Sequence, residues 1–243
     1  MSTIEITILD WFTGLFSLIT VIIASIIGLI MILRYKKYKL KVLLLMGLAQ
    51  IFIISPWWAS SGSWILYVIT GVPFNPTQYI FFTSWLVPFA GITMGWAISL
   101  LKAKEYQNVL IIIFSVIGVI AEVLLITFLI IDPSIHGYFI SPFDVEFRGF
   151  LRYYLLFMIL FIGTTGILIA IDSLKSSEPE IKLKGKFLII AFISWTVGAI
   201  ADAAVPTNFI SLFIVRALLI SSSIELYIGY IQPKWIKKVF IKE

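Results

Sequence analysis

The chain has 243 residues, of which 60% are hydrophobic and 13% are charged, and its formal net charge is +5. This apolar content is more than a soluble domain of that length can bury, so the composition excludes a soluble globular protein and predicts that lipid surrounds most of the chain. The basic residues flank apolar runs, where they set orientation and meet anionic lipid rather than nucleic acid, and the absence of cysteine excludes disulfides and thiolate metal sites.

The first residues include Glu5 and Asp10 but no basic side chain before the first apolar run, so we expect no cleavable signal peptide. A helix needs about 20 apolar residues to cross the hydrocarbon core of a bilayer. Seven runs reach this length, and they predict an all-α membrane protein with a seven-transmembrane-helix bundle. The predicted spans cover residues 11–33, 42–72, 79–101, 109–131, 153–171, 187–205 and 209–231.

The second predicted span is too long for one straight crossing. It contains Pro56 and the serine-rich stretch 60–63, either of which can kink or break a helix. We expect this span to end near Ser60 and to be followed by a short segment at the membrane interface over residues 64–70.

The basic residues divide unevenly between the two sides that these spans create. Fifteen of the 18 fall in one set of connecting segments, only Arg148 and Arg152 fall in the other, and Arg216 lies within the last span. Because basic flanking residues stay in the cytoplasm, we predict a multi-pass protein of the cell membrane with its amino terminus outside and its carboxyl terminus in the cytoplasm. The fifteen are Arg34, Lys36, Lys37, Lys39, Lys41, Lys102, Lys104, Lys175, Lys182, Lys184, Lys186, Lys234, Lys237, Lys238 and Lys242.

Two domains follow from this pattern: a transmembrane domain over residues 1–232 and a basic amphipathic cytoplasmic tail over residues 233–243. In the tail, apolar side chains share one side of a helix and lysines share the other, which is typical of a helix that lies at a membrane interface. The apolar side chains are Trp235, Ile236, Val239 and Phe240, and the lysines are Lys234, Lys237, Lys238 and Lys242.

The longest connection on the predicted outer side, residues 132–150, mixes proline, glycine, aromatic and charged residues. It is long enough to fold over the bundle as a lid or a small hairpin, and the alternative is an ordered cap without function. This connection holds His136, the only histidine of the chain. Because no second histidine and no cysteine lies nearby, we expect an exposed loop residue and no metal site.

Four ionisable residues lie inside predicted spans, where charged groups are costly and normally find partners in the bundle interior. Glu122, Asp202 and Arg216 fall in the outer half of the membrane when depth is counted at about 1.5 Å per residue. We expect Asp202 and Arg216 to form a salt bridge across the last two spans, with Glu122 as a third member of a ligand-binding or intramembrane polar cluster. The salt bridge either recognises a ligand or only holds the two helices together.

Glu225 lies in the inner half, nine residues after Arg216, so it is on the opposite face of the same helix and cannot share that site. Ser221 and Ser222 precede Glu225 by four and three residues, so their hydroxyls can reach its side of the helix. This inner-half acid is either a neutral or hydrogen-bonded side chain packed between helices or a proton carrier.

Motifs of known enzyme classes are absent from the sequence. It contains no zinc-hydrolase motif, no nucleophile elbow and no phosphate-binding glycine loop. We therefore expect a protein that is not an enzyme and that has no cofactor.

Three stretches resemble a family of archaeal seven-helix membrane proteins of uncharacterised function: ISPFDVEF at 140–147, KGKFLIIAFISWTVGAIADAAVP at 184–206 and LLISSSIELYIGYIQPKWIKKVFIKE at 218–243. The architecture is similar to the seven-helix sensor region that precedes kinase or cyclase domains in microbial signalling proteins. That resemblance implies a sensor with a separate partner, because only a short tail follows the last span. Microbial rhodopsins attach retinal to a lysine of the last helix, and the last span here has none, which excludes covalent retinal.

Together these features favour a receptor-like or partner-binding membrane module that senses a small ligand or lipid from the outer half of the bundle. Its basic inner face is expected to contact anionic membrane lipids and a separate cytoplasmic effector. The alternative is a transporter or an ion-conducting protein that uses Glu122, Asp202 and Arg216.

Overall fold

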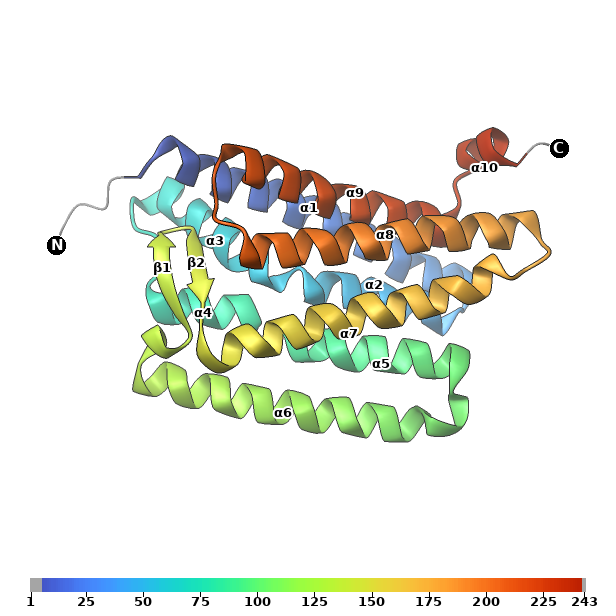
Figure 1. Ribbon diagram of the computed structural model, residues 1–243, viewed down its shortest axis with the longest axis horizontal. Coiled ribbons are helices and arrows are strands. Elements are labelled where there is room, and N and C mark those ends of the chain that lie inside the picture. The colour runs from blue at the N-terminus through green and yellow to red at the C-terminus, as the bar shows by residue number, and fades with distance from the viewer. Residues whose placement is uncertain (1–5, 242–243) are drawn as a thin grey trace.

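The computed structural model describes residues 6–241, which are almost entirely helical (Figure 1). The helices are α1 (Ile8–Tyr38), α2 (Lys41–Ile53), α3 (Ser55–Thr70), α4 (Pro76–Ser84), α5 (Val87–Lys102), α6 (Gln107–Ile131), α7 (Gly149–Leu174), α8 (Pro179–Ala204), α9 (Phe209–Ile231) and α10 (Lys234–Phe240). An antiparallel hairpin of β1 (Gly137–Ser141) and β2 (Asp144–Phe147) lies between α6 and α7. Short 3-10 turns at Lys104–Tyr106 and Pro133–Ile135 flank α6.

Within residues 6–241, six helical segments are long and apolar enough to cross a membrane: α1, α4 together with α5, α6, α7, α8 and α9. The pair α2 and α3 adds a seventh if it crosses as one span, bent by 50°. The predicted all-α membrane bundle is therefore confirmed, and each segment falls on one of the seven apolar runs of the sequence.

The bend between α2 and α3 lies earlier than the sequence suggested. It occurs at Ile54, two residues before Pro56, and α3 then continues without a break to Thr70. The helix therefore has no break near Ser60, and the expected end there was wrong; the location of residues 64–70 at the membrane interface stays a prediction. Proline bends the helix because it lacks an N–H and its ring displaces the preceding turn. The serines leave the helix intact, because hydroxyls such as that of Ser60 bond to another part of the chain.

The spans form a closed ring in which α1, α2 with α3, α5, α7, α8 and α9 pack against their neighbours in turn. Helix α6 lies outside this ring and packs against α5 (Figure 1). The hairpin lies at the end of the bundle where α1 begins, and α10 lies at the opposite end. We call the first the hairpin end, made of residues 132–148 and 205–208. The second is the basic end, made of residues 39–40, 103–106, 175–178 and α10.

Three helices that begin at the hairpin end start with reciprocal caps. In α1, Thr7 and Asp10 each accept a hydrogen bond from the other's backbone N–H, and Asn208 with Ser211 does the same at the start of α9. Helix α4 begins with the same arrangement. Such caps satisfy backbone donors that the first turn leaves free, so they define where these helices begin.

Helix α6 presents a broad apolar face away from α5. Ile112 is 61% exposed, Val119 64% and Val123 58%. Soluble monomeric proteins rarely expose a continuous apolar surface of this size, so this face of α6 is suited to contact with lipid chains.

The tail forms the short helix α10, which docks on the start of α8. Ile236 is buried there, and Lys237 forms an ion pair with Glu180. Trp235 and Val239 are exposed, so only part of the apolar side of α10 packs against the rest of the chain. Lys242 and Glu243, the last two residues of the predicted tail, lie outside the described residues.

Candidate functional site

The hairpin is tied to the bundle at its tip. The Ser63 hydroxyl donates to the Pro142 carbonyl oxygen over 2.8 Å. The carbonyl oxygen of Phe143 accepts two hydrogen bonds, from the Ser60 hydroxyl at 2.8 Å and from the Tyr79 hydroxyl at 2.9 Å. Phe143 itself is completely buried. The connection thus forms the small hairpin that the sequence allowed, held over the bundle by side chains of α3 and α4.

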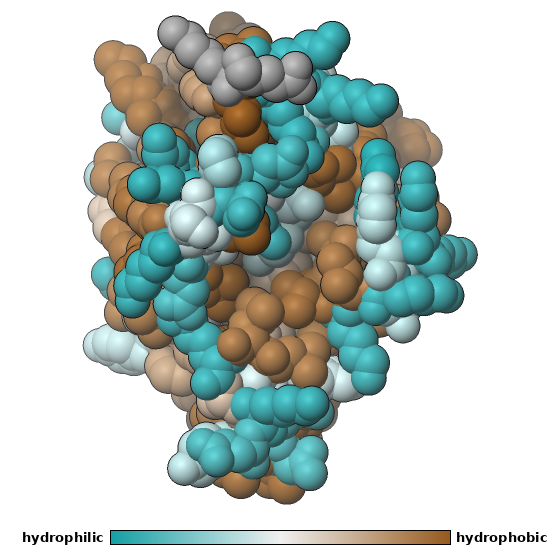
Figure 2. Space-filling model, turned by 90° about the vertical axis from the view of Figure 1, so that its right-hand side faces the viewer, coloured by the Kyte–Doolittle hydropathy of each residue, from teal (hydrophilic) through white to brown (hydrophobic). Residues whose placement is uncertain are grey.

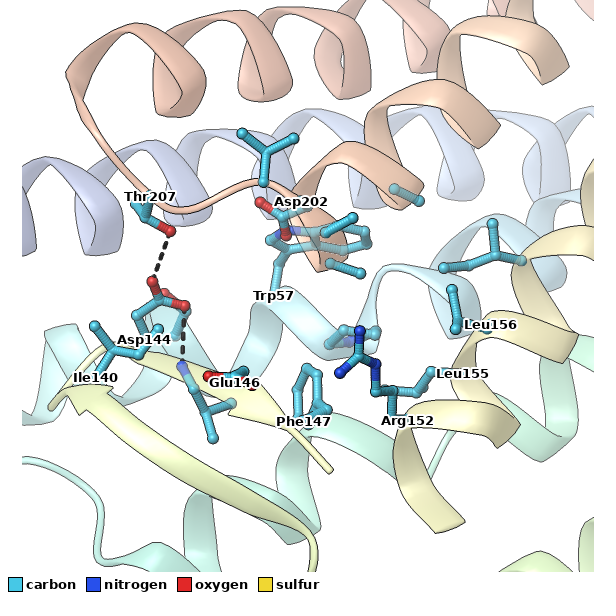
Figure 3. Close-up of a pocket in the computed structure, with 18 of the residues that line it drawn as sticks. Trp57, Ile140, Asp144, Glu146, Phe147, Arg152, Leu155, Leu156, Asp202 and Thr207 are labelled. Carbon is cyan, nitrogen blue, oxygen red and sulfur yellow. Dashed lines mark hydrogen bonds between the residues drawn. The ribbon is translucent and has the colours of Figure 1, made fainter. Parts of the chain in front are cut away.

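A pocket of about 290 Å³ lies under this hairpin. Its walls come from α3, the hairpin, α7, α8, the α8–α9 turn and α9 (Figure 3). Apolar side chains such as Trp57, Leu155 and Leu156 form much of the wall, and charged side chains reach it from four different segments. A concave, largely apolar space with a few convergent polar groups is the usual form of a small-molecule site.

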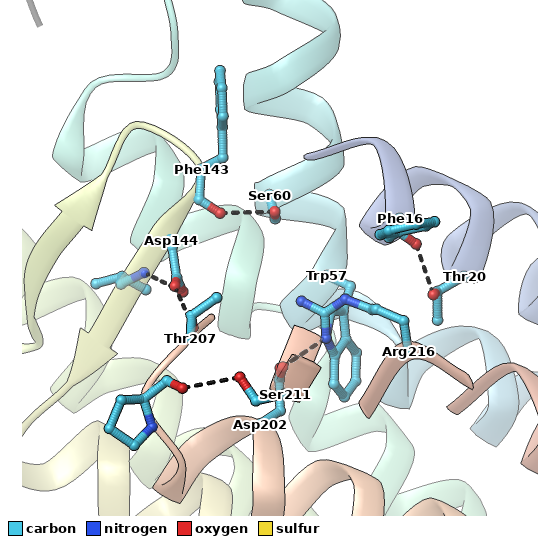
Figure 4. A network of polar contacts seen from close by, with 12 residues as sticks. Phe16, Thr20, Trp57, Ser60, Phe143, Asp144, Asp202, Thr207, Ser211 and Arg216 are labelled. Carbon is cyan, nitrogen blue, oxygen red and sulfur yellow. Dashed lines mark hydrogen bonds and ion pairs between the residues drawn. The ribbon is translucent and has the colours of Figure 1, made fainter. Parts of the chain in front are cut away.

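The predicted salt bridge forms part of this wall. The Arg216 Nη1 of α9 is 2.6 Å from the Asp202 Oδ1 of α8. The other carboxylate oxygen, Oδ2, accepts a hydrogen bond from the Trp57 indole nitrogen at 2.9 Å (Figure 4). Both side chains line the pocket, and Asp202 is the more accessible of the two, with 31% of its side chain exposed against 7% for Arg216.

Asp144 of β2 connects the hairpin to the turn between α8 and α9. Its carboxylate accepts a hydrogen bond from the Thr207 hydroxyl at 2.8 Å (Figures 3 and 4). Burial raises the pKa of the Asp144 carboxyl above its usual value, and the charge of Asp202 acts in the same direction, although the bond from Thr207 opposes the shift. The hairpin therefore contributes a second carboxylate to the pocket.

Several hydrogen-bond donors at the pocket have no acceptor among the described residues. Arg152 extends from α7 into the space beside the hairpin, and its guanidinium forms no ion pair or hydrogen bond with residues 6–241 (Figure 3). The Nε of Arg216 and the indole nitrogen of Trp195 are buried and also lack acceptors. Buried donors without acceptors are costly, so they mark the places where a bound group would be stabilised.

Glu122, the third member of the predicted cluster, does not join the other two. It is half-buried on α6, close to Tyr154 of α7, and it does not line the pocket. The separation arises because α6 lies outside the ring to which α8 and α9 belong. Of the three predicted residues, the structure brings together Asp202 and Arg216 only.

Glu225 of α9 does not line the pocket. Its Oε2 is buried and has no hydrogen-bond partner among the described residues. The Ser221 and Ser222 hydroxyls donate to carbonyl oxygens of their own helix, Leu218 at 3.1 Å and Leu219 at 2.8 Å. Both serine hydroxyls therefore donate their hydrogen bonds to the backbone of α9.

His136 is buried, so the expectation of an exposed loop residue was wrong. Its Nε2 lies 3.2 Å from the Leu125 carbonyl oxygen of α6, and its ring packs on Phe128. The hairpin folds back on the end of α6 and encloses the imidazole, and this burial lowers the pKa of His136. Within residues 6–241, no group of three histidine or acidic side chains is placed to hold a metal ion.

Sequence reasoning missed Trp57, Asp144 and Arg152 as pocket residues. Asp144 lies in one of the stretches that carried the family resemblance, and Arg152 was noted only for its side of the membrane. A signal existed in the clustering of charges around residues 144–152, next to a span boundary. Comparisons with protein-family models, with curated proteins and with solved structures found no match to this chain, so the meaning of the pocket rests on its own geometry.

Proposed function

We propose that this chain is a receptor-like membrane module of the cell membrane, with the hairpin end outside. In this proposal a small amphipathic ligand enters the pocket under the hairpin, and the change is passed to a separate cytoplasmic effector at the basic end. The ligand carries an anionic or hydrogen-bond-accepting group and an apolar body.

The observation that carries this proposal is the set of free donors in an otherwise apolar pocket. Arg152, the Arg216 Nε and the Trp195 indole have no acceptor among the described residues, and all three line the same space. An acceptor group of a ligand would accept hydrogen bonds from these donors, while Leu155 and Leu156 would contact the apolar part of the ligand. The volume of about 290 Å³ is at the lower end of the range for small-molecule sites, which favours a small ligand.

The path to the other end of the molecule is provided by α9. Arg216 lines the pocket, and the same helix leads through Ile231 to α10 at the basic end. A ligand whose anionic or accepting group competes with Asp202 for Arg216 would favour one arrangement of the α8–α9 pair over another, which is the requirement for a ligand to shift a conformational equilibrium. The exposed side chains of Trp235 and Val239 on α10 offer the effector an apolar contact.

Native mass spectrometry of the protein released from its membrane tests the ligand directly. We expect a retained small molecule that is present in the wild type and lost in Leu156→Trp, because the larger ring fills the pocket. The matched control is Leu160→Trp, one turn later on α7, where Leu160 is 55% exposed and does not line the pocket. Arg152→Gln should lower the retained fraction roughly tenfold, as expected when a charge-assisted hydrogen bond is lost.

Loss of the molecule from both tryptophan variants would show that it binds elsewhere and would reject the pocket as its site. Retention in Leu156→Trp at the wild-type level would do the same. In either case the circular dichroism spectrum and the unfolding temperature of each variant confirm that the bundle is intact.

Ion or proton conduction is the second candidate. It is favoured by a buried hydrogen bond of 3.0 Å from the Gln50 amide to Ser223, which lies along α9 between Arg216 and Glu225. With Glu122 apart, such a route would use Asp202, Arg216 and this pair. Proteoliposomes with a pH-sensitive dye inside distinguish the candidates. Conduction requires a proton flux that exceeds the flux into protein-free vesicles, and Arg216→Leu should abolish this excess.

A further inference from the structure

A second cavity, of about 620 Å³, opens at the basic end. Its walls come from α1, the start of α2, the end of α5, α7, α8 and the end of α9. Figure 2 shows this end of the molecule, where hydrophilic side chains surround a hollowed apolar centre. None of its lining residues belongs to the pocket under the hairpin.

The charges of this cavity are strongly one-sided. Among the described residues, four cations line it, and Asp172 is the one carboxylate that does so. The Asp172 Oδ2 is 2.9 Å from the Lys102 Nζ, so this carboxylate is already paired. Arg34, Lys41 and Lys184 form no ion pair with any of the residues 6–241. Three positive charges are therefore available to an anion.

Lys184 and Tyr230 bring two of the polar groups together. The Lys184 Nζ lies 5.1 Å from the centre of the Tyr230 ring, and both side chains line the cavity. The Tyr230 hydroxyl is buried and has no hydrogen-bond partner among the described residues. A buried hydroxyl beside an unpaired ammonium is well placed to donate to a phosphate or carboxylate oxygen.

The rest of the wall is apolar. Leu43, Ile169 and Ile231 line the interior, and Leu101, which is 48% exposed, lies at the edge toward the surface of the bundle. A soluble anion would use the cations and leave this apolar surface unoccupied. A molecule with an anionic head and a hydrocarbon chain uses both, and the membrane supplies such molecules in large excess.

We propose that this cavity is a binding site for an anionic phospholipid. The phosphate lies among Arg34, Lys41 and Lys184, where it accepts the hydrogen bond of Tyr230, and one acyl chain follows the wall of Leu43 and Ile169. The proposal does not depend on the ligand pocket at the hairpin end. Under the proposed orientation the lipid belongs to the cytoplasmic leaflet.

Native mass spectrometry in detergent, with added lipids of identical acyl chains, tests the site. We expect phosphatidylglycerol to be retained at least roughly tenfold more strongly than zwitterionic phosphatidylcholine, because only the former keeps a net negative charge for the cations. The double variant Arg34→Gln/Lys184→Gln should lose this preference. The control Lys36→Gln/Lys182→Gln removes the same charge from the same two helices, at exposed positions outside the cavity, and should keep it.

Asp172→Asn gives a second test, in which the expected result is a gain of lipid binding rather than a loss. It frees Lys102 and removes the one lining carboxylate, so we expect tighter retention of phosphatidylglycerol by several-fold. Equal retention of the two lipids, an equal loss in the control, or no gain in Asp172→Asn would overturn the proposal. Displacement of the lipid by millimolar inorganic phosphate would identify a site for the free anion and would also overturn it.

Discussion

Arg216 and Asp202 are unequal partners in their salt bridge. The guanidinium is enclosed almost completely, whereas nearly a third of the aspartate side chain is exposed toward the pocket. The Asp202 carboxylate also accepts a hydrogen bond from the Trp57 indole, so both Arg216 and Trp57 depend on it as their acceptor. A buried donor that loses its acceptor cannot be rehydrated, while an exposed carboxylate can.

The two single substitutions should therefore differ in cost. We expect Asp202→Ala to lower the free energy of unfolding by roughly 3 kcal/mol, because it leaves Arg216 and the Trp57 indole without an acceptor. Arg216→Leu should cost less, about 1–2 kcal/mol, because Asp202 keeps the Trp57 bond and contacts water. The double variant should recover much of the larger loss. Unfolding in detergent micelles measures all three, and a double variant as unstable as the sum of the singles would contradict the pairing.

At the scale of single elements, the hairpin is held by hydrogen bonds from three directions, and one of them is sensitive to pH. The pKa of Asp144 is raised in the folded protein by burial. The folded state therefore keeps its proton to a higher pH than the unfolded state does, and stability falls as pH rises between the two pKa values.

We expect the unfolding temperature of the wild type, measured relative to that of Asp144→Asn, to fall as pH rises from about 4 through the raised pKa of Asp144. Asparagine does not titrate and has one accepting oxygen in place of the two that bind the Thr207 hydroxyl and the Val145 N–H, so the lost hydrogen bond adds only a pH-independent offset to its unfolding temperature. Glu146→Gln, an exposed position on the same strand, serves as the control and should keep the wild-type profile. Parallel profiles for the wild type and Asp144→Asn would show that this carboxyl does not titrate differently in the folded protein.

Helices α1 and α2 approach each other through two glycines. A Cβ atom at Gly47 would lie 2.6 Å from the Gly28 carbonyl oxygen, and one at Gly28 would lie 2.8 Å from the Gly47 oxygen. Such close backbone contact is common where helices pack in membranes, because small residues permit it.

Gly47→Ala should accordingly destabilise the protein by roughly 1–3 kcal/mol, the usual cost of overpacking, although alanine favours a helix more than glycine does. Gly62→Ala on α3 is the matched control, because the nearest atoms to its Cβ belong to the Phe74 ring, at 3.0 Å, and a side chain can shift. Thermal unfolding in detergent compares the two. A stabilised Gly47→Ala would mean that α1 and α2 separate without cost.

On the scale of the whole molecule, the two ends differ in chemistry. The hairpin end carries capped helix starts and the pocket under the hairpin, and the basic end carries the cavity rich in cations and α10. From the positive-inside rule we propose that the basic end lies in the cytoplasm.

Because the chain has no cysteine, single cysteines can report this orientation without background. Tyr138 of the hairpin is 59% exposed and Val239 of α10 is 67% exposed. In intact cells we expect a membrane-impermeant maleimide to label Tyr138→Cys but not Val239→Cys, and both should react after the membrane is opened. The reverse pattern in intact cells would invert the proposed orientation and move the ligand pocket to the cytoplasmic side.

The sequence by itself determined the helices and the pair that joins two of them. Span positions follow from the lengths of the apolar runs, because a bilayer requires a fixed length of apolar helix. The pairing of Asp202 with Arg216 was also predictable, because a short turn joins two antiparallel neighbours and leaves their relative depth little freedom.

Only the tertiary structure decided which spans became neighbours. The span that contains α6 has a mean hydropathy of 3.1, but α1 inside the ring reaches 2.8, so hydropathy alone did not place α6 apart and separate Glu122 from Arg216. The same holds for the pocket, whose Trp57, Asp144 and Arg152 come from segments far apart along the chain. Their meeting depends on how the hairpin folds back onto α3, which is a consequence of packing between distant segments and leaves no periodic pattern in the sequence.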